Sequence, residues 1–296
     1  MSLSCLFCGG ENLKATGSRR SVSFSRYQRF YRCVKCAAFV LYPSLSESEI
    51  AAMYTHTYIH EVNPDGAVDQ NTNVSRFRQL FDFLEDRVKN RGDFSYLDFG
   101  CGADAETLIF AKSIGYAAQG VELTPSAREE AASRSGCEVL SPNALSSIGN
   151  QYDTIFLGDL IEHVYNPRFI LTDLKSHLKS DGVIFIQGPL EAATTLSNFL
   201  LAIKSLLTPG RSSELPPYHV SLANFYAMKL LLEASDYRID WYKITEPLWP
   251  ANRVFSVNSF RSPSNFVFSF TKLLDMAFSK ILKNYGTRIY LVAKLK

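Results

Sequence analysis

The chain has 296 residues, of which 46% are hydrophobic and 20% charged, and its formal net charge is +2. This composition supports a large buried core and excludes a low-complexity chain, a collagen-like chain and a pair of complete enzymes. The longest apolar runs are only strand-sized, so we expect no transmembrane segment. Residues 1–10 lack the basic start and apolar stretch of a secretory signal, which predicts a cytoplasmic protein.

The first 43 residues form a basic segment with two CxxC pairs. Cys5 and Cys8 are separated from Cys33 and Cys36 by 24 residues, a layout in which two knuckles supply four thiolates to one structural Zn²⁺. We therefore predict a zinc ribbon over residues 1–43, with four unmetallated thiols as the alternative. Seven basic residues against one acidic residue give this segment a charge of +6, so an anionic partner is expected.

The remainder, residues 44–296, is predicted to be a single α/β domain. A capping box at Ser46 and Glu49 opens one helix, and apolar spacing predicts a second helix over residues 74–88. Short apolar runs then alternate with helical stretches at residues 105–114, 126–135 and 167–179; the runs are Tyr96–Phe99, Ala117–Val121, Thr154–Leu157 and Val183–Gln187. This alternation predicts a Rossmann-like, doubly wound and mostly parallel sheet.

The last third of the chain adds further elements to this domain. Residues 189–218 are predicted to be an insertion with one amphipathic helix, followed by a helix at 225–234 and a strand at 238–245. An apolar stripe over residues 264–283 is typical of core packing, with a dimer contact or a membrane surface as the alternatives. The chain closes with a strand over residues 288–293, expected to be antiparallel.

A glycine-rich loop lies where the first strand of the domain meets a helix. Gly100 and Gly102 allow a tight turn and close approach of a ligand to the backbone. With Ala105 and the later Glu122 they also fit the fingerprint of dinucleotide-binding proteins. However, the carboxylates of Asp98 and Asp104 would repel a pyrophosphate and tolerate a sulfonium cofactor. This charge pattern favours S-adenosylmethionine.

Together with the CxxC pairs, three further segments make the chain similar to a known family; they are Asp98–Gly102, Asp159–Val164 and His219–Phe225. The chain resembles the class I S-adenosylmethionine-dependent methyltransferases of the bacterial type that carries an N-terminal zinc ribbon, a methyltransferase-23-like family. The resemblance implies that a cofactor site is formed by Asp98, Gly100 and Gly102 at the methionine end, Glu122 at the ribose, Asn143 at the adenine, and Asp159.

The chain departs from the family pattern at Asp104, where a third glycine is usual. We expect the Asp104 carboxylate to compensate by capping the following helix.

Three residues are candidates for the chemistry of the acceptor. His163 lies in a loop after a central strand, where open α/β sheets bind ligands, and its side chain is suited to act as a general base. Glu162 is expected to orient His163 or to help bind a metal. His219, at the end of the insertion, is expected to be a second base or a substrate contact, and a purely structural role is the alternative for both histidines.

The resemblance implies transfer of a methyl group to a small-molecule or glycan acceptor, such as a sugar nucleotide, of anionic character. One alternative is an RNA methyltransferase whose basic ribbon holds RNA, and another is a catalytically silent zinc-ribbon interaction protein. A nicotinamide-dependent oxidoreductase is disfavoured by Asp98. A homodimer is compatible with the sequence.

Overall fold

The computed structural model describes residues 3–23, 26–46, 48–49, 70–88, 93–145, 149–207, 219–247 and 263–296. The predicted helix after Ser46 lies outside these residues beyond Glu49. Its capping box is present, since the Ser46 amide donates to Glu49 Oε2 (2.7 Å) and the Glu49 amide donates to Ser46 Oγ (3.3 Å).

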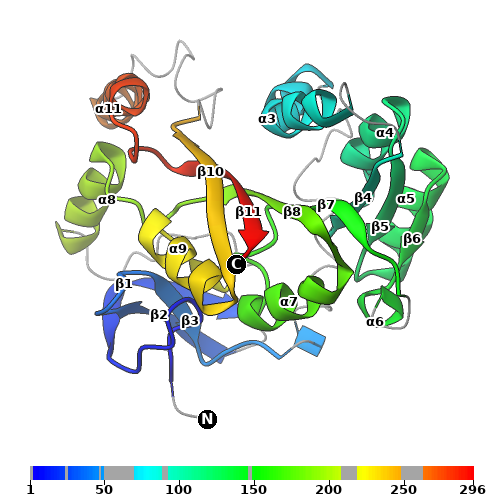
Figure 1. Ribbon diagram of the computed structural model, residues 1–296. Coiled ribbons are helices and arrows are strands. Elements are labelled where there is room, and N and C mark those ends of the chain that lie inside the picture. The colour runs from blue at the N-terminus through cyan, green and yellow to red at the C-terminus, as the bar shows by residue number, and fades with distance from the viewer. Residues whose placement is uncertain are drawn as a thin grey trace.

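A seven-stranded sheet forms the centre of the domain (Figure 1). Its order is β10-β11-β8-β7-β4-β5-β6, with bounds β4 Ser95–Phe99, β5 Ala117–Val121, β6 Glu138–Leu140, β7 Tyr152–Gly158, β8 Leu178–Pro189, β10 Tyr237–Thr245 and β11 Arg288–Leu295. Strands β8 to β6 pair in parallel, whereas β11 is antiparallel to both β8 and β10. This arrangement confirms the predicted Rossmann-like sheet and its antiparallel last strand.

Helices flank the sheet; they are α3 Gln70–Val88, α4 Glu106–Ser113, α5 Pro125–Ser135, α6 Pro142–Leu145, α7 Pro167–Asp173, α8 Leu196–Leu207, α9 Phe225–Ala234 and α11 Pro263–Ile281. Helix α7 is shorter than predicted, because a 3₁₀ turn (Leu174–His177) follows it and β8 begins at Leu178. Its start is as the sequence indicates: Asn166 Oδ1 accepts from the Phe169 amide (3.1 Å), and Pro167 follows.

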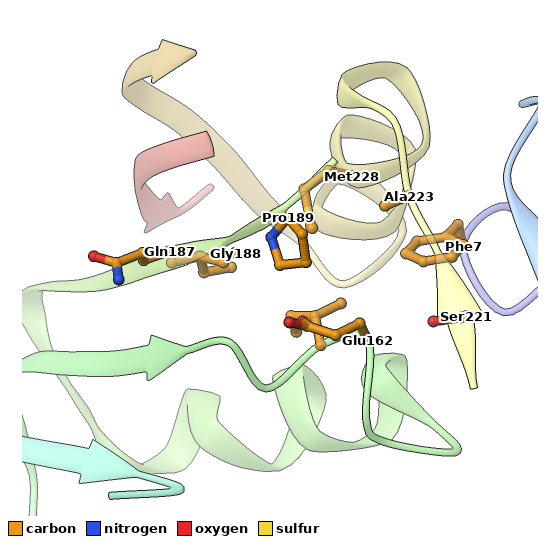
Figure 2. A pocket seen from close by; sticks show the side chains of 10 residues that line it. Phe7, Glu162, Gln187, Gly188, Pro189, Ser221, Ala223 and Met228 are labelled. Carbon is orange, nitrogen blue, oxygen red and sulfur yellow. The ribbon is translucent and has the colours of Figure 1, made fainter. Parts of the chain in front are cut away.

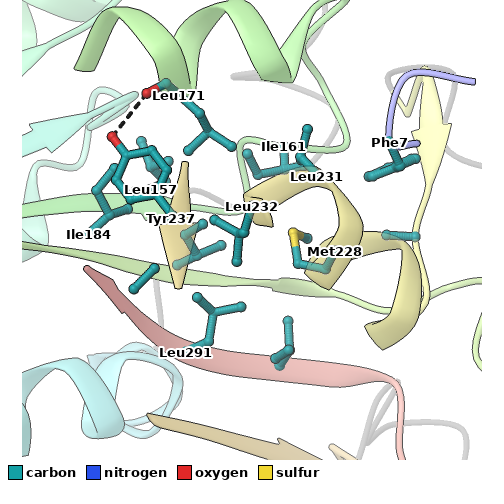
Figure 3. Close-up of a cluster of buried hydrophobic side chains, with 14 of the residues drawn as sticks. Phe7, Leu157, Ile161, Leu171, Ile184, Met228, Leu231, Leu232, Tyr237 and Leu291 are labelled. Atoms are coloured by element: carbon teal, nitrogen blue, oxygen red, sulfur yellow. Dashed lines mark hydrogen bonds between the residues drawn. The ribbon is translucent and has the colours of Figure 1, made fainter. Parts of the chain in front are cut away.

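Alternating side chains divide the core into two layers. Tyr96 and Phe156 on adjacent strands pack with Leu80 of α3 on one face, whereas Leu97 and Ile155 pack on the other. Figure 3 shows the second layer, in which Tyr237, Leu231 and Met228 gather; the Tyr237 hydroxyl donates to the Leu171 carbonyl (2.9 Å). This two-residue alternation is expected of a sheet covered on both faces.

The cysteine-bearing segment forms a second sheet below α9 in Figure 1. Its strands β1 Leu13–Ser23, β2 Arg26–Cys33 and β3 Phe39–Tyr42 are antiparallel, and a fourth strand, β9 Ser221–Leu222, joins from the far end of the insertion. The Leu41 amide also donates to the Val220 carbonyl (2.9 Å). The N-terminal segment is therefore bonded to the chain beside His219.

None of the helices in the described part of the chain combines the length and apolar content required to cross a bilayer.

Candidate active site

The glycine loop after β4 has the backbone that its sequence requires. Gly100 (φ +93°) and Gly102 (φ +63°) both lie in the left-handed region, which side chains adopt at a cost. A Cβ placed on Gly102 would meet no atom within 4 Å, so the backbone faces open space there. At Gly100 a Cβ would lie 3.0 Å from Leu160 Cδ1, which shows that this loop touches the loop after β7.

Glu122 fastens the glycine loop from the end of the neighbouring strand. Its Oε2 accepts from the Gly102 amide (3.1 Å), and its Oε1 accepts from the Thr124 amide (3.0 Å). Each carboxylate oxygen can accept more than one hydrogen bond, so Glu122 retains acceptor capacity for a ligand hydroxyl.

The expectation that Asp104 caps α4 is wrong. Ala105 occupies the N-cap position in a left-handed conformation (φ +50°), and no side chain caps the helix. Because the chain turns at Ala105, Asp104 is directed outward, where it pairs with Arg134 (3.3 Å) on α5.

Asp98 is a buried carboxyl group at the base of the glycine loop. It is 2% exposed and accepts a hydrogen bond from the Thr107 hydroxyl of α4. Burial raises the pKa of Asp98 to about 7; the Thr107 bond works in the opposite direction, and the nearby Glu122 adds to the increase. A cation bound in this loop would restore the ionised form of Asp98.

The two other predicted cofactor residues lie at the same edge of the sheet, in different surroundings. Asn143 is an exposed residue of α6. Asp159 follows β7 in a left-handed conformation (φ +48°), and its Oδ2 lies 2.8 Å from Arg288 Nη2 at the start of β11. The Asp159 carboxylate is thus held by a partly buried ion pair.

The structure brings together the three candidates for acceptor chemistry. His163 Nε2 lies 3.8 Å from Glu162 Oε1, and the rings of His163 and His219 meet edge to face with centroids 4.7 Å apart. One oxygen or nitrogen from each of the three side chains lies within 4.8 Å of the others. The set can therefore handle a proton or contribute ligands to a divalent cation.

Glu191, which the sequence analysis did not single out, orients His219. Its Oε2 lies 2.7 Å from His219 Nδ1. Burial works to lower the pKa of His219, but the hydrogen bond with Glu191 and the nearby carboxylates of Glu162 and Asp159 raise it overall. Glu191 lies two residues after the end of β8, and the rule that parallel strands present functional groups at their carboxyl ends could have found it.

Glu162 is buried among these groups. Burial, with the Asp159 carboxylate as the next contribution, raises the pKa of Glu162 to about 8, against the opposing effect of His219. Its carbonyl accepts from the Val220 amide (2.8 Å), which joins the loop after β7 to the end of the insertion. The cluster is therefore fixed by backbone bonds as well as by its side chains.

A small pocket beside this cluster is lined by both parts of the chain. Figure 2 shows Phe7 of the first CxxC pair facing the same space as Glu162, Ser221 and Met228. Phe7 is buried, and its side chain belongs to the same apolar core as Met228 of α9. The cysteine-bearing segment thus packs directly against the loop that carries Glu162.

The four cysteines converge as the CxxC spacing predicts. Cys5 Sγ lies 3.5 Å from Cys36 Sγ, Cys8 Sγ lies 3.5 Å from Cys33 Sγ, and all four sulfurs lie within 4.8 Å of one another. Tetrahedral Zn²⁺ with bonds of about 2.3 Å separates its sulfurs by about 3.8 Å, so this donor set fits zinc.

Both knuckles turn through a left-handed residue. Gly9 and Ala37, each directly after its CxxC pair, both have positive φ angles, and Asn224 Nδ2 donates to the Cys36 carbonyl (2.9 Å).

Comparison with known proteins assigns the chain to a family. Residues 73–240, more than half of the chain, match the family described as "Methyltransferase domain". The chain belongs to this family. It is a methyltransferase, as the glycine loop and the later motifs predict. No curated protein sequence matches this methyltransferase.

Solved structures share its fold at low sequence identity. Magnesium protoporphyrin IX methyltransferase from Synechocystis, solved with bound S-adenosylhomocysteine, has a TM-score of 0.54 and 13% identity, over 85% of this chain and all of the other. The PH0226 protein from Pyrococcus horikoshii has a TM-score of 0.51 and 13% identity, over 82% of this chain and 99% of the other. These similarities confirm the Rossmann-like fold.

Proposed function

We propose that this methyltransferase transfers a methyl group from S-adenosylmethionine to a small-molecule or glycan acceptor that binds beside His163 and His219. The contact between the loops after β4 and β7, at Gly100 and Leu160, carries the proposal, because the glycine loop, which would hold the cofactor, adjoins the loop that bears His163. When bound, the cofactor supplies a methyl group on a positively charged sulfur, open to in-line displacement.

The residues of the glycine loop fit such a cofactor. Asp98 would hold its ammonium group, Glu122 would accept from the ribose hydroxyls, and the open space at Gly102 admits the ligand against the backbone. Asn143 would contact the adenine, and Asp159 would support the site through its pair with Arg288.

His163 would take the proton that the acceptor loses as the new bond to the methyl group forms. Glu162 and His219 border it, and Glu191 holds the His219 ring in one orientation. An anionic acceptor would be attracted by the basic N-terminal segment.

The proposal is tested by incubating the purified full-length protein with labelled S-adenosylmethionine and a panel of nucleotide-linked sugars, with cellular RNA as a separate sample. Label in a sugar product supports the proposal. Label only in RNA would replace it with RNA methylation, and a protein that does not bind S-adenosylhomocysteine in calorimetry would refute the cofactor assignment.

For the base, we expect His163→Ala to lower turnover by about 10²–10⁴-fold while the affinity for S-adenosylhomocysteine stays unchanged. The matched control is His177→Gln, which changes a buried histidine whose Nδ1 lies 3.2 Å from the Asn150 carbonyl oxygen, outside the cluster. Equal turnover in His163→Ala and the wild type would show that His163 takes no proton.

A further inference from the structure

Helices α8 and α11 carry most of the large apolar side chains that are exposed in the described part of the chain. They and the residue after α11 hold ten of the seventeen, namely Phe199, Leu201, Ile203, Phe266, Val267, Phe270, Leu273, Phe278, Ile281 and Leu282. The stripe at residues 264–283, typical of core packing in the sequence, therefore lies largely on the surface. Figure 1 shows both helices on the side of the molecule opposite α4 to α6.

The two helices are fixed to each other through a buried carboxylate. Asp275 of α11 accepts from the amides of Leu196 (2.9 Å) and Ser197 (2.9 Å) at the start of α8, and from the hydroxyls of Ser197 and Tyr285. Asp275 is fully buried. The exposed apolar faces thus belong to a rigid pair of helices, and they are not frayed ends of the fold.

The exposed charges on this helix pair have a single sign. Asp275 is buried, and Lys272 is buried in an ion pair with Glu246. Among the side chains that the structure describes from Leu196 to Ile203 and from Phe266 to Lys283, the exposed charged ones are Lys280 and Lys283. An apolar surface bordered by lysines and free of exposed carboxylates is the pattern of helices that lie flat on anionic lipid.

We propose that the outer faces of α8 and α11, here called the helix platform, bind the surface of a membrane rich in anionic lipid. A second copy of the chain fits less well, because the exposed charged side chains described on the helices are all positive and offer no acid to pair with the lysines across a two-fold contact. Lipid phosphates supply that opposite charge. This inference goes beyond the proposed methyl transfer and does not depend on it.

A platform at this place would orient the active site. Helix α8 begins only five residues after Glu191, and Asn198 Nδ2 donates to the Ala193 carbonyl (2.8 Å) between them. Docking of the platform would therefore hold the edge of the sheet that bears Glu191 and His219 close to the lipid surface. An acceptor linked to lipid could then reach these two residues.

The test is sedimentation of the purified full-length protein with vesicles of phosphatidylcholine alone or of phosphatidylcholine and phosphatidylglycerol in equal parts. We expect binding to the anionic vesicles that weakens with salt. Phe270→Glu with Ile281→Glu, at positions 54% and 78% exposed, should lower the partition coefficient by on the order of a hundredfold. The matched control is Ile109→Glu with Phe169→Glu, 42% and 66% exposed on α4 and α7, which should bind as the wild type does.

Two further measurements separate the effect of charge from a failure to fold. Lys280→Gln with Lys283→Gln should reduce binding to anionic vesicles and leave binding to neutral ones unchanged. Melting curves and S-adenosylhomocysteine binding identify variants that fail to fold. The proposal is overturned if the wild type does not sediment with anionic vesicles, if both glutamate pairs reduce binding equally, or if light scattering shows a dimer that Phe270→Glu with Ile281→Glu dissociates while vesicle binding persists.

Discussion

Asp98→Asn should make the ligand-free protein more stable at alkaline pH while weakening cofactor binding. The pKa of Asp98 is raised from 3.8 to about 7, so the native state keeps the proton over a range in which the unfolded chain has lost it. The contribution of this group to the free energy of unfolding is complete below about pH 4 and is lost as the pH rises to about 7, a change on the order of 4 kcal/mol. Asparagine has no such ionisation and can accept the Thr107 bond.

Cofactor affinity should follow the opposite trend. An ionised Asp98 makes a charge-assisted bond of about 1.5–3 kcal/mol with an ammonium group, so Asp98→Asn should weaken S-adenosylhomocysteine about 10- to 150-fold at pH 8. Below about pH 7 the Asp98 carboxyl group of the wild type is protonated. The affinity of the wild-type protein for S-adenosylhomocysteine should therefore fall by up to about tenfold per pH unit. The difference between the two proteins should therefore narrow at pH 5.5.

The assay is calorimetric titration with S-adenosylhomocysteine from pH 5.5 to 8.5, with melting curves of the ligand-free proteins at the same pH values. Asp104→Asn is the matched control, because it changes an exposed aspartate of the same loop that pairs with Arg134. Equal affinity of the wild type and Asp98→Asn across this range, or a ligand-free variant less stable than the wild type at pH 8.5, would refute the reasoning.

Three further predictions concern the zinc knuckles and the histidine cluster. Cys33→Ser should abolish binding of about one zinc ion per chain in elemental analysis and lower the melting temperature, whereas Cys101→Ser, outside the cluster, should retain the metal. Ala37→Gly should raise the free energy of unfolding by about 0.5–1 kcal/mol in urea, since Ala37 has φ +61°, whereas Ala132→Gly within α5 should lower it by about 1 kcal/mol. Glu191→Gln should lower the pKa of His219, because the variant removes the carboxylate that opposes the effect of burial. The pKa is measured from the imidazole NMR signals of His219, and an unchanged value would exclude the contact with Glu191.

Local patterns in the sequence were sufficient for most elements and for the convergence of the four cysteines. The CxxC spacing identified four cysteines whose sulfurs converge, since each knuckle is a local turn and the strands between the pairs form a hairpin. Strand and helix periodicity placed Asp98 and Glu122 at one edge of the sheet, because the carboxyl ends of parallel strands share an edge. The capping of α4 was missed, since a left-handed Ala105 leaves no mark in the sequence.

Contacts between distant segments were decided only by the tertiary structure. Strand β9 is too short to show periodicity and exists because β3 pairs with it. The pairs His219–Glu191 and Asp159–Arg288 form because the end of the insertion and the start of β11 both return to the edge of the sheet at which β7 ends. The stripe of α11 is a further instance, since periodicity shows that one face of a helix is apolar but not what covers that face. In the folded chain, Asp275 fixes α11 to α8, and the apolar face of α11 points outward. The sequence does not reveal this orientation, because the hydrogen bonds of Asp275 join segments that are 78 and 79 residues apart.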